Sequence, residues 1–523
     1  MTEGIRNMAR HRGLRPILLL CALVLLLTGR PAVDASEKVF YYGLEGEPES
    51  LDWAKAASLR AERVTWLLCD SLVNTSKDGQ RLEPGLAQSW SVSPDGRRVV
   101  VKVRPGVQFH DGTPLDAGAI KVNFERQFRP SHSLYTSEPP NAKEAMLTGL
   151  IEDVEVQDSL TLILRLKYPG LHYLSEVHIV SPTALAKLGK GFGRNPVCTG
   201  PFGFESWSAD RIELLANDKY WAGRPRIDRV VFRINADGKA LADALLRGEV
   251  DFVPVLPDPL YFERVRESAT ARLASIPGLN IFYLGFYTDR APFNAPAFRK
   301  ATVQAVNVPR IAQYLGRGTV VAAKGPLPPA MKAYDPAVGQ TAFDPQASLA
   351  LLKKNGYEQP PVVRLVYNSA LMLISELAGA IQSDLQKVGI KVELLGKPGW
   401  REVVEAARAR EGDMFIYNWH VSAPYPERIL MPLFHSRSAG TSNLTHYKSP
   451  AVDRMLDEAK SLPEGPKQKR LYSQIQTMIV EDAPMVFLFH SSRMGAYASR
   501  VQGLTLRLDV APDDKLVKVD LSP

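Results

Sequence analysis

The chain has 523 residues and a formal net charge of +8, with 45% hydrophobic and 23% charged residues. This length exceeds what one hydrophobic core normally supports, so we expect two or three lobes, and the composition is typical of a folded globular protein. The basic residues form no long runs, so the sequence gives no support for nucleic-acid binding.

The first 35 residues have the features of a secretory signal peptide. A lead of four arginines precedes the eleven-residue apolar run at 17–27 (ILLLCALVLLL), and small residues at 33–35 offer a cleavage site before Ser36. The run is shorter than the roughly 20 residues that cross a bilayer, although an uncleaved anchor is the alternative. This segment carries five arginines against two acids, which leaves about +5 for the rest of the chain. We therefore expect a secreted, soluble protein.

The first half of the secreted chain is predicted to be rich in strands. Residues 39–44 form a strand, and a helix over 58–72 places Val64, Leu67, Leu68 and Leu72 on one apolar face. A two-residue period then predicts strands at 98–104, 160–167 and 226–233.

The stretch 109–114 (FHDGTP) places His110 beside Asp111. A catalytic pair would need a nucleophile, which the sequence does not nominate. Asp-Gly is a turn dipeptide, and Asp116 can cap a helix over 116–126. The stretch is therefore interpreted as a turn between a strand and a helix.

From Asp344 onward, helices and strands alternate, which indicates an α/β lobe. Asp344-Pro345 and Ser449-Pro450 are helix starts, and Asn355-Gly356 ends the first of these helices. One apolar helical face ends at Gly389, strands are predicted at 390–395 and 413–418, and a further helix spans 471–479.

No strong catalytic, cofactor or metal-binding motif is present. The sequence lacks nucleophile-elbow, zinc-protease and phosphate-loop patterns, and the glycine-dense stretch 189–194 is predicted to be a loop. No two histidines have the spacing that places two metal ligands on one helical turn. We expect no cofactor, no metal and no enzymatic activity. Beyond the signal segment, Cys69 and Cys198 form one disulfide or remain two buried thiols.

A group of aromatic residues surrounds the predicted strand 413–418. Trp400, Tyr417, Trp419 and Tyr425 lie close in sequence, next to the loop 420–426 (HVSAPYP). Loops at the carboxyl ends of strands in α/β lobes bind ligands, and flat rings can enclose a small molecule. The alternative is that these rings belong to the core. A separate residue, Trp90, is assigned to the core.

Eight motifs in order give the chain a family resemblance. It is similar to the family-five extracellular solute-binding proteins, the periplasmic binding proteins of peptide-type ABC importers. The motifs are SLD at 50–52, LAQSWSVSPDG at 86–96, VQFHDGTPL at 107–115, TGPF at 199–202, NDKYW at 217–221, RGEVD at 247–251, NGY at 355–357 and IQSDL at 381–385.

The resemblance implies an α/β clamshell of two lobes, type II-like, with an extra subdomain in the first lobe. Lobe I would comprise 36–284 and 491–523, with the subdomain at about 74–200, and lobe II would comprise 285–490. The chain would cross between the lobes near 280–287 and 485–490. Such a protein is a periplasmic monomer that binds no nucleic acid, captures a peptide or another small solute in the cleft and delivers it to a membrane permease.

The resemblance also implies a binding site at Trp400, Trp419, His420, Ser422, Tyr425 and Asn368. Relatives that grip dipeptide termini have an acid where Ser422 stands and an arginine that corresponds to Asn368, and their acid-proline pair is Tyr425-Pro426 here. Neither Ser422 nor Asn368 can form an ion pair, so longer peptides become the first expectation. The alternatives are a non-peptide solute (a nickel chelate, haem, glutathione or an opine) and a secreted hydrolase that uses His110-Asp111 or His420.

Overall fold

The computed structural model describes residues 37–56, 58–135, 142–316, 318–508 and 515–522. The predicted signal peptide, residues 1–35, lies outside these ranges. Residues Lys38–Pro523 form one compact unit. None of the helices in the described ranges combines the length and the apolar character that a bilayer crossing requires.

Lobe I is built on a seven-stranded sheet with the order β12-β19-β11-β1-β10-β9-β8. The strand β1 (Val39–Leu44) lies parallel to β10 (Arg229–Ile234) near the middle of the sheet, and Phe40, Tyr42 and Leu44 are fully buried in its core. The other strands are β8 (Phe202–Trp207), β9 (Arg211–Ala216), β11 (Phe252–Val253), β12 (Ala271–Ile276) and β19 (Arg493–Ala498). Helices of this lobe include α1 (Leu59–Leu68), α4 (Pro182–Leu188), α5 (Gly238–Leu246) and α6 (Pro259–Arg266).

The subdomain has a sheet and a core of its own. Its strands β4 (Ala87–Val92), β5 (Arg98–Val103), β6 (Ile151–Asp158) and β7 (Thr161–Leu166) have the order β4-β5-β7-β6. Val99 and Val101 of β5 are buried with Phe124 of α2 (Ala117–Phe128), as the period of the sequence predicted. The short strands β2 (Val73–Thr75) and β3 (Leu82–Pro84), the helix α3 (Ala142–Leu150) and the 3₁₀ helix η1 (Leu171–Glu176) complete this region. The 3₁₀ helix η2 (Gly189–Arg194) follows α4 and belongs to lobe I, because its Phe192 is buried in the lobe I core.

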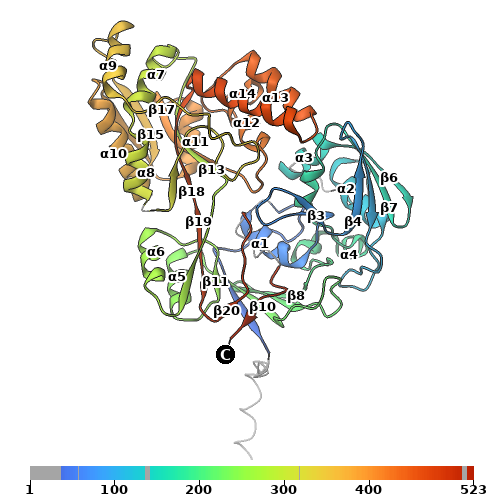
Figure 1. The fold of residues 1–523 in the computed structure, drawn as a ribbon. Coiled ribbons are helices and arrows are strands. Elements are labelled where there is room, and N and C mark those ends of the chain that lie inside the picture. Colours follow the sequence, from blue (N-terminus) through green and yellow to red (C-terminus); the bar gives the residue numbers. More distant parts are fainter. Residues whose placement is uncertain (1–36, 57, 136–141, 317, 509–514, 523) are drawn as a thin grey trace, which may run out of the picture. The chain divides into compact units, whose positions relative to one another are not determined.

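Lobe II is a six-stranded sheet with helices on both faces (Figure 1). Its order is β14-β18-β13-β17-β15-β16. Neighbouring residues of β17 face opposite cores, because Ile416 packs with one helical layer and Phe415 with the other. The strands are β13 (Asn280–Phe286), β14 (Val320–Ala322), β15 (Val363–Asn368), β16 (Val392–Lys397), β17 (Met414–His420) and β18 (Met485–Ser491). The helices are α7 (Pro296–Ala305), α8 (Val308–Gly316), α9 (Pro345–Lys354) and α10 (Met372–Gln386) on one face and α11 (Trp400–Ala409), α12 (Glu427–Phe434), α13 (Pro450–Ser461) and α14 (Pro466–Asp482) on the other.

The chain passes between the two large sheets twice, at 277–279 between β12 and β13 and at 492 between β18 and β19 (Figure 1). Asn280 ties the crossings together: its amide nitrogen donates to the carbonyl oxygen and the Oγ of Ser491 at 3.1 and 2.8 Å. A Cβ atom on Gly278 would lie 1.9 Å from the Ser491 carbonyl oxygen, so this approach requires glycine. The two stretches expected to cross, near 280–287 and 485–490, are instead β13 and β18, which are central strands of lobe II. The domain boundaries 36–284, 285–490 and 491–523 remain our proposal.

Most local predictions are confirmed. Asp116, Asp344 and Ser449 each cap a helix, and Gly356 has a left-handed φ of +80°. The FHDGTP stretch is a turn in which the His110 ring contacts the carbonyl oxygen of Gly200 at 3.0 Å and the Asp111 carboxylate accepts from the Ser181 hydroxyl at 2.8 Å.

Two local predictions are wrong. The stretch 189–194 is a 3₁₀ helix rather than a loop, and it continues directly from α4. Helix α1 ends at Leu68, four residues before the predicted end at 72. The backbone beyond it is drawn into tertiary contacts, because the Asp70 carbonyl accepts from Ile179 and the Ser71 carbonyl accepts from Leu86.

Candidate functional site

Three adjacent cavities lie where lobe I and the subdomain meet lobe II. The first cavity has a volume of about 90 Å³ and shares Leu59, Glu62, Glu176 and Ser422 with the second, which measures about 540 Å³. The third cavity measures about 660 Å³ and shares Tyr173, Glu427 and Lys460 with the second. The three cavities are therefore adjacent to one another along the cleft.

The strand β17 brings Trp419 and His420 to this cleft. They are its last two residues and pair with Ile281 and Asn280 of β13, next to the crossing at 277–279. Trp419 is half-buried, donates from Nε1 to the Arg428 carbonyl oxygen at 2.9 Å and lines the second cavity. Trp419 thus lies beside a cavity at the end of a strand, and its role in binding remains a prediction.

His420 also lines the second cavity, and its ring contacts the guanidinium of Arg493. The side chain is exposed as a whole. Protein atoms packed around the ring and the Arg493 cation lower the pKa of His420 to about 4. The imidazole is therefore neutral near pH 7.

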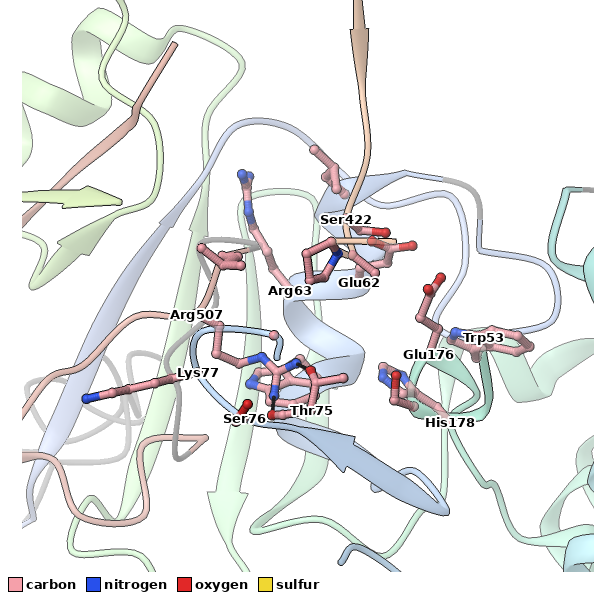
Figure 2. Close-up of a pocket in the computed structure, with 17 residues that line it drawn as sticks. Trp53, Glu62, Arg63, Thr75, Ser76, Lys77, Glu176, His178, Ser422 and Arg507 are labelled. Atoms are coloured by element: carbon pink, nitrogen blue, oxygen red, sulfur yellow. Dashed lines mark hydrogen bonds between the residues drawn. The ribbon is translucent and has the colours of Figure 1, made fainter. Parts of the chain in front are cut away.

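Ser422 lines the first and second cavities, where relatives that grip dipeptide termini have an acid. Two carboxylates face the same space from elsewhere in the chain. Figure 2 shows Glu62 of α1 and Glu176 of η1 beside Ser422 in the first cavity. The acidic side chains in this part of the cleft therefore come from lobe I and the subdomain, and they lie in the same cavity as the cations Arg63, Lys77 and Arg507.

Tyr425 lines the third cavity but is almost fully buried. Its ring stacks on His172 of η1 with the centroids 3.8 Å apart, and the Lys332 ammonium lies 5.0 Å from the ring centroid. The Tyr425 hydroxyl has no hydrogen-bond partner among the described residues. It is therefore positioned as a wall between the subdomain and lobe II.

Trp400 and Asn368 line none of these three cavities. Trp400 begins α11 and packs edge-on against Tyr417 with the ring centroids 5.6 Å apart. Asn368 ends β15, is buried, and its side-chain oxygen accepts from the Ala370 N–H at 3.0 Å. Their role in binding remains a prediction.

Trp90 was assigned to the core, and its side chain does pack against the buried core of the subdomain, although it also borders the cleft. The residue is half-buried and lines the third cavity. It belongs to β4, an edge strand of the subdomain sheet. No further strand lies beyond this edge, and the cleft lies there instead. The alternating pattern of a single strand does not show whether that strand forms the edge of a sheet.

Charged contacts between η1 and α12 close one side of the cleft. The Glu427 carboxylate lies 3.0 Å from the His172 Nε2 atom and accepts from the Tyr173 hydroxyl at 3.0 Å, and Arg428 pairs with Glu176 at 2.6 Å. These contacts were not predicted from the sequence. Glu427 and Arg428 directly follow the loop 420–426, which was the one available signal.

Glu427 has a pKa far from its ordinary value. Burial alone would raise the pKa, but the hydrogen bond and charge of His172 and the Tyr173 hydroxyl outweigh burial and lower the pKa from 4.5 to about 2. A carboxyl group with a depressed pKa stabilises the folded state above its unfolded pKa. That contribution is lost as the pH falls from about 4.5 toward 2.

We expect Glu427→Gln to lower the free energy of unfolding at pH 7 by about 3 kcal/mol and to flatten its fall between pH 5 and pH 3. Urea denaturation at a series of pH values measures both effects. Glu464→Gln, at an exposed acid that pairs with Lys332, should keep the pH dependence of the unmodified protein. Parallel pH curves for Glu427→Gln and the unmodified protein would contradict the assignment.

The cleft holds no metal site that the described residues can form, because they contain no group of three or more histidine, cysteine, aspartate or glutamate side chains placed to hold an ion. Its lining is instead aromatic rings, carboxylates and cations, which suits an organic solute that binds through stacking, hydrogen bonds and ion pairs.

The model of the bacterial extracellular solute-binding proteins, family 5 (middle region), matches residues 81–441. The chain belongs to this family. Family membership makes the protein a solute-binding component of transport, so the secreted-hydrolase alternative gains no support.

Relatives in the family match along most of the chain. Haem-binding protein A of Haemophilus influenzae is 28% identical over 83% of this chain and 83% of that protein. The dipeptide-binding protein of Escherichia coli is 27% identical over 90% of this chain and 93% of that protein.

Solved structures confirm the α/β periplasmic-binding-protein fold. The periplasmic binding protein DppA of Helicobacter pylori, in complex with the peptide STSA, has a TM-score of 0.75 at 26% identity and covers 93% of this chain and 98% of its own. HbpA2 of Haemophilus parasuis has a TM-score of 0.84 at 23% identity and covers 93% of this chain and 100% of its own.

Proposed function

We propose that this protein is the periplasmic substrate-binding component of an ABC importer and that it delivers peptides to a permease in the inner membrane. Export would use the signal peptide at 1–35, which is cleaved. The protein would bind its ligand as a monomer, without a cofactor and without catalysis. Family membership and the names of the relatives support the transport role.

The size and the adjacency of the second and third cavities support an oligopeptide ligand. The second and third cavities, of about 540 and 660 Å³, each fall within the range of roughly 300–1,000 Å³ that holds a small ligand. They share lining residues and are therefore adjacent, and we propose that an extended peptide occupies both. Extended peptides bind through main-chain hydrogen bonds and place their side chains in pockets. Ser422 and Asn368 disfavour a gripped dipeptide, since neither supplies a charge.

A non-peptide solute is the second candidate. Relatives named for haem binding and a solved structure with agropinic acid, which is 25% identical, show that similar chains hold other solutes. The aromatic lining of the third cavity, with Trp90, Tyr168 and Tyr472, would suit a planar ligand.

Native mass spectrometry of the purified protein, followed by mild denaturation and analysis of the released molecules, distinguishes these candidates. We expect peptides of three or more residues. Thermal shifts with defined peptide pools provide the second readout, and the bound peptide should be recovered unchanged after incubation. An empty cleft together with no thermal shift from any peptide pool would contradict peptide transport.

We expect Trp419→Ala to weaken peptide binding by about 5- to 30-fold, which corresponds to the loss of about 1–2 kcal/mol of ring contact in the second cavity. Isothermal titration calorimetry measures the change. Trp207→Ala is the matched control, because Trp207 lies on β8 and lines none of the three cavities. The same titration of Trp400→Ala tests the proposed role of that residue. Equal affinities for Trp419→Ala and Trp207→Ala would remove Trp419 from the site.

A further inference from the structure

Lys460 of α13 brings a cation to the junction of the second and third cavities. It lines both of them and is half-buried. Its Nζ atom lies 4.0 Å from the centroid of the Tyr168 ring. No described carboxylate lies within 4.0 Å of this ammonium, so its contact in the protein is an aromatic face.

Two neighbouring cations of the cleft are already neutralised. Lys332, in the third cavity, pairs with Glu464 at 2.8 Å, and Arg428, in the second, pairs with Glu176 at 2.6 Å. Lys460 therefore differs from these two neighbours in having no ion-pair partner among the described residues. It differs from Lys469 of the third cavity, which is exposed to water, in being half-buried.

The acids nearest to Lys460 in the fold are committed to other groups. Glu427 lines the same two cavities, but it is held by His172, Tyr173 and Tyr472. Asp457, one turn earlier on α13, lies 3.4 Å from His435 and 3.7 Å from Arg437.

An ammonium that is partly removed from water and lacks an anion is costly. Burial and the neighbouring Arg437 cation lower the pKa of Lys460, which reflects this cost. The contact with the face of a tyrosine ring compensates only part of the hydration free energy that the ammonium loses. An anion that enters the cleft would compensate more of this free energy, because hydrogen bonds between charged groups are among the strongest in proteins.

We propose that Lys460 binds a carboxylate of the ligand where the second and third cavities meet. For a peptide this is the C-terminal carboxylate, so Lys460 supplies the positive charge that Asn368 cannot. This inference rests on the proposed peptide function. It makes the cleft selective for peptides with a free C-terminus that reaches the junction.

The test compares alanine peptides of three to five residues as free acids and as C-terminal amides, titrated calorimetrically into the full-length secreted protein. The unmodified protein should bind the best free acid about tenfold or more tightly than its amide. Lys460→Met should bring this ratio close to one, and Lys460→Arg should retain most of it. Lys332→Met is the matched control and should keep the full preference.

The outcomes separate the inference from the function on which it rests. Peptides that bind equally well as acids and amides to the unmodified protein would overturn the role of Lys460 and leave peptide binding intact. A preference for the free acid that persists in Lys460→Met would also overturn the role of Lys460 and leave peptide binding intact. If no peptide in either form binds, the peptide function and the carboxylate site both fail. Thermal melting of each variant checks folding. Lys460→Met removes the contact with the Tyr168 ring but no ion pair, so its melting temperature should change little.

Discussion

Replacing Cys69 and Cys198 together by alanine is expected to lower the free energy of unfolding by about 4–5 kcal/mol. The two cysteines, which the sequence left either paired or free, form a disulfide with a sequence separation of 129 residues. A bond that closes so long a loop removes much of the conformational entropy of the unfolded chain. Urea denaturation of the oxidised protein and of the double variant measures the difference.

Reduction provides the control for this prediction. The unmodified protein in excess dithiothreitol should unfold at the same urea concentration as the double variant in the same reductant, because both then lack the bond. Equal stability of the oxidised protein and the variant would contradict the prediction. The disulfide suits the oxidising periplasm in which we propose that the protein functions.

Asp70→Asn is expected to destabilise the protein by about 3–5 kcal/mol. The Asp70 carboxylate is buried beside the disulfide and accepts from the Lys515 ammonium at 2.6 Å, from the Trp221 Nε1 atom at 2.9 Å and from the Thr199 hydroxyl at 3.1 Å. Lys515 is also buried. Removing the negative charge leaves this ammonium inside the protein without a counter-charge, which costs more than the loss of one hydrogen bond.

A double-mutant cycle tests this explanation. Lys515→Met in the Asp70→Asn background should recover part of the lost stability, because it removes the uncompensated cation. Urea denaturation of the two single variants and the double variant gives the coupling energy. Additive losses would show that the two side chains act independently. Lys515 lies in the C-terminal segment, so the pair also fastens the end of the chain to lobe I.

The two stability predictions concern the part of lobe I that supports the cleft. Helix α1 ends at the residue before Cys69 and carries Glu62, which lines the first and second cavities. If the disulfide and Asp70 hold this helix in place, their loss should weaken binding more than a surface substitution of equal stability cost does. The cleft therefore depends on residues that never contact the ligand.

Local features of the structure were readable from the sequence because they depend on neighbours within a few residues. Asp344 caps α9 and Gly356 follows its end because a carboxylate oxygen meets the backbone three residues on and glycine tolerates a positive φ. The strand period placed Val99 and Val101 in a core. The end of β17 indicated Trp419 and Ser422, and the order of the motifs indicated the family that the comparison confirmed.

Tertiary structure decided which side chains share the cleft. Glu176, Glu427 and Lys460 come from three separate elements. Apart from the position of Glu427 directly after the loop 420–426, nothing within their own segments distinguishes them from ordinary surface charges. The same holds for Trp90, whose strand proved to be an edge that faces a cavity. Capping and periodicity arise from hydrogen bonds and burial within one element, whereas the charge of a cleft arises from how separate elements pack, so the candidate carboxylate site at Lys460 emerged only from the folded chain.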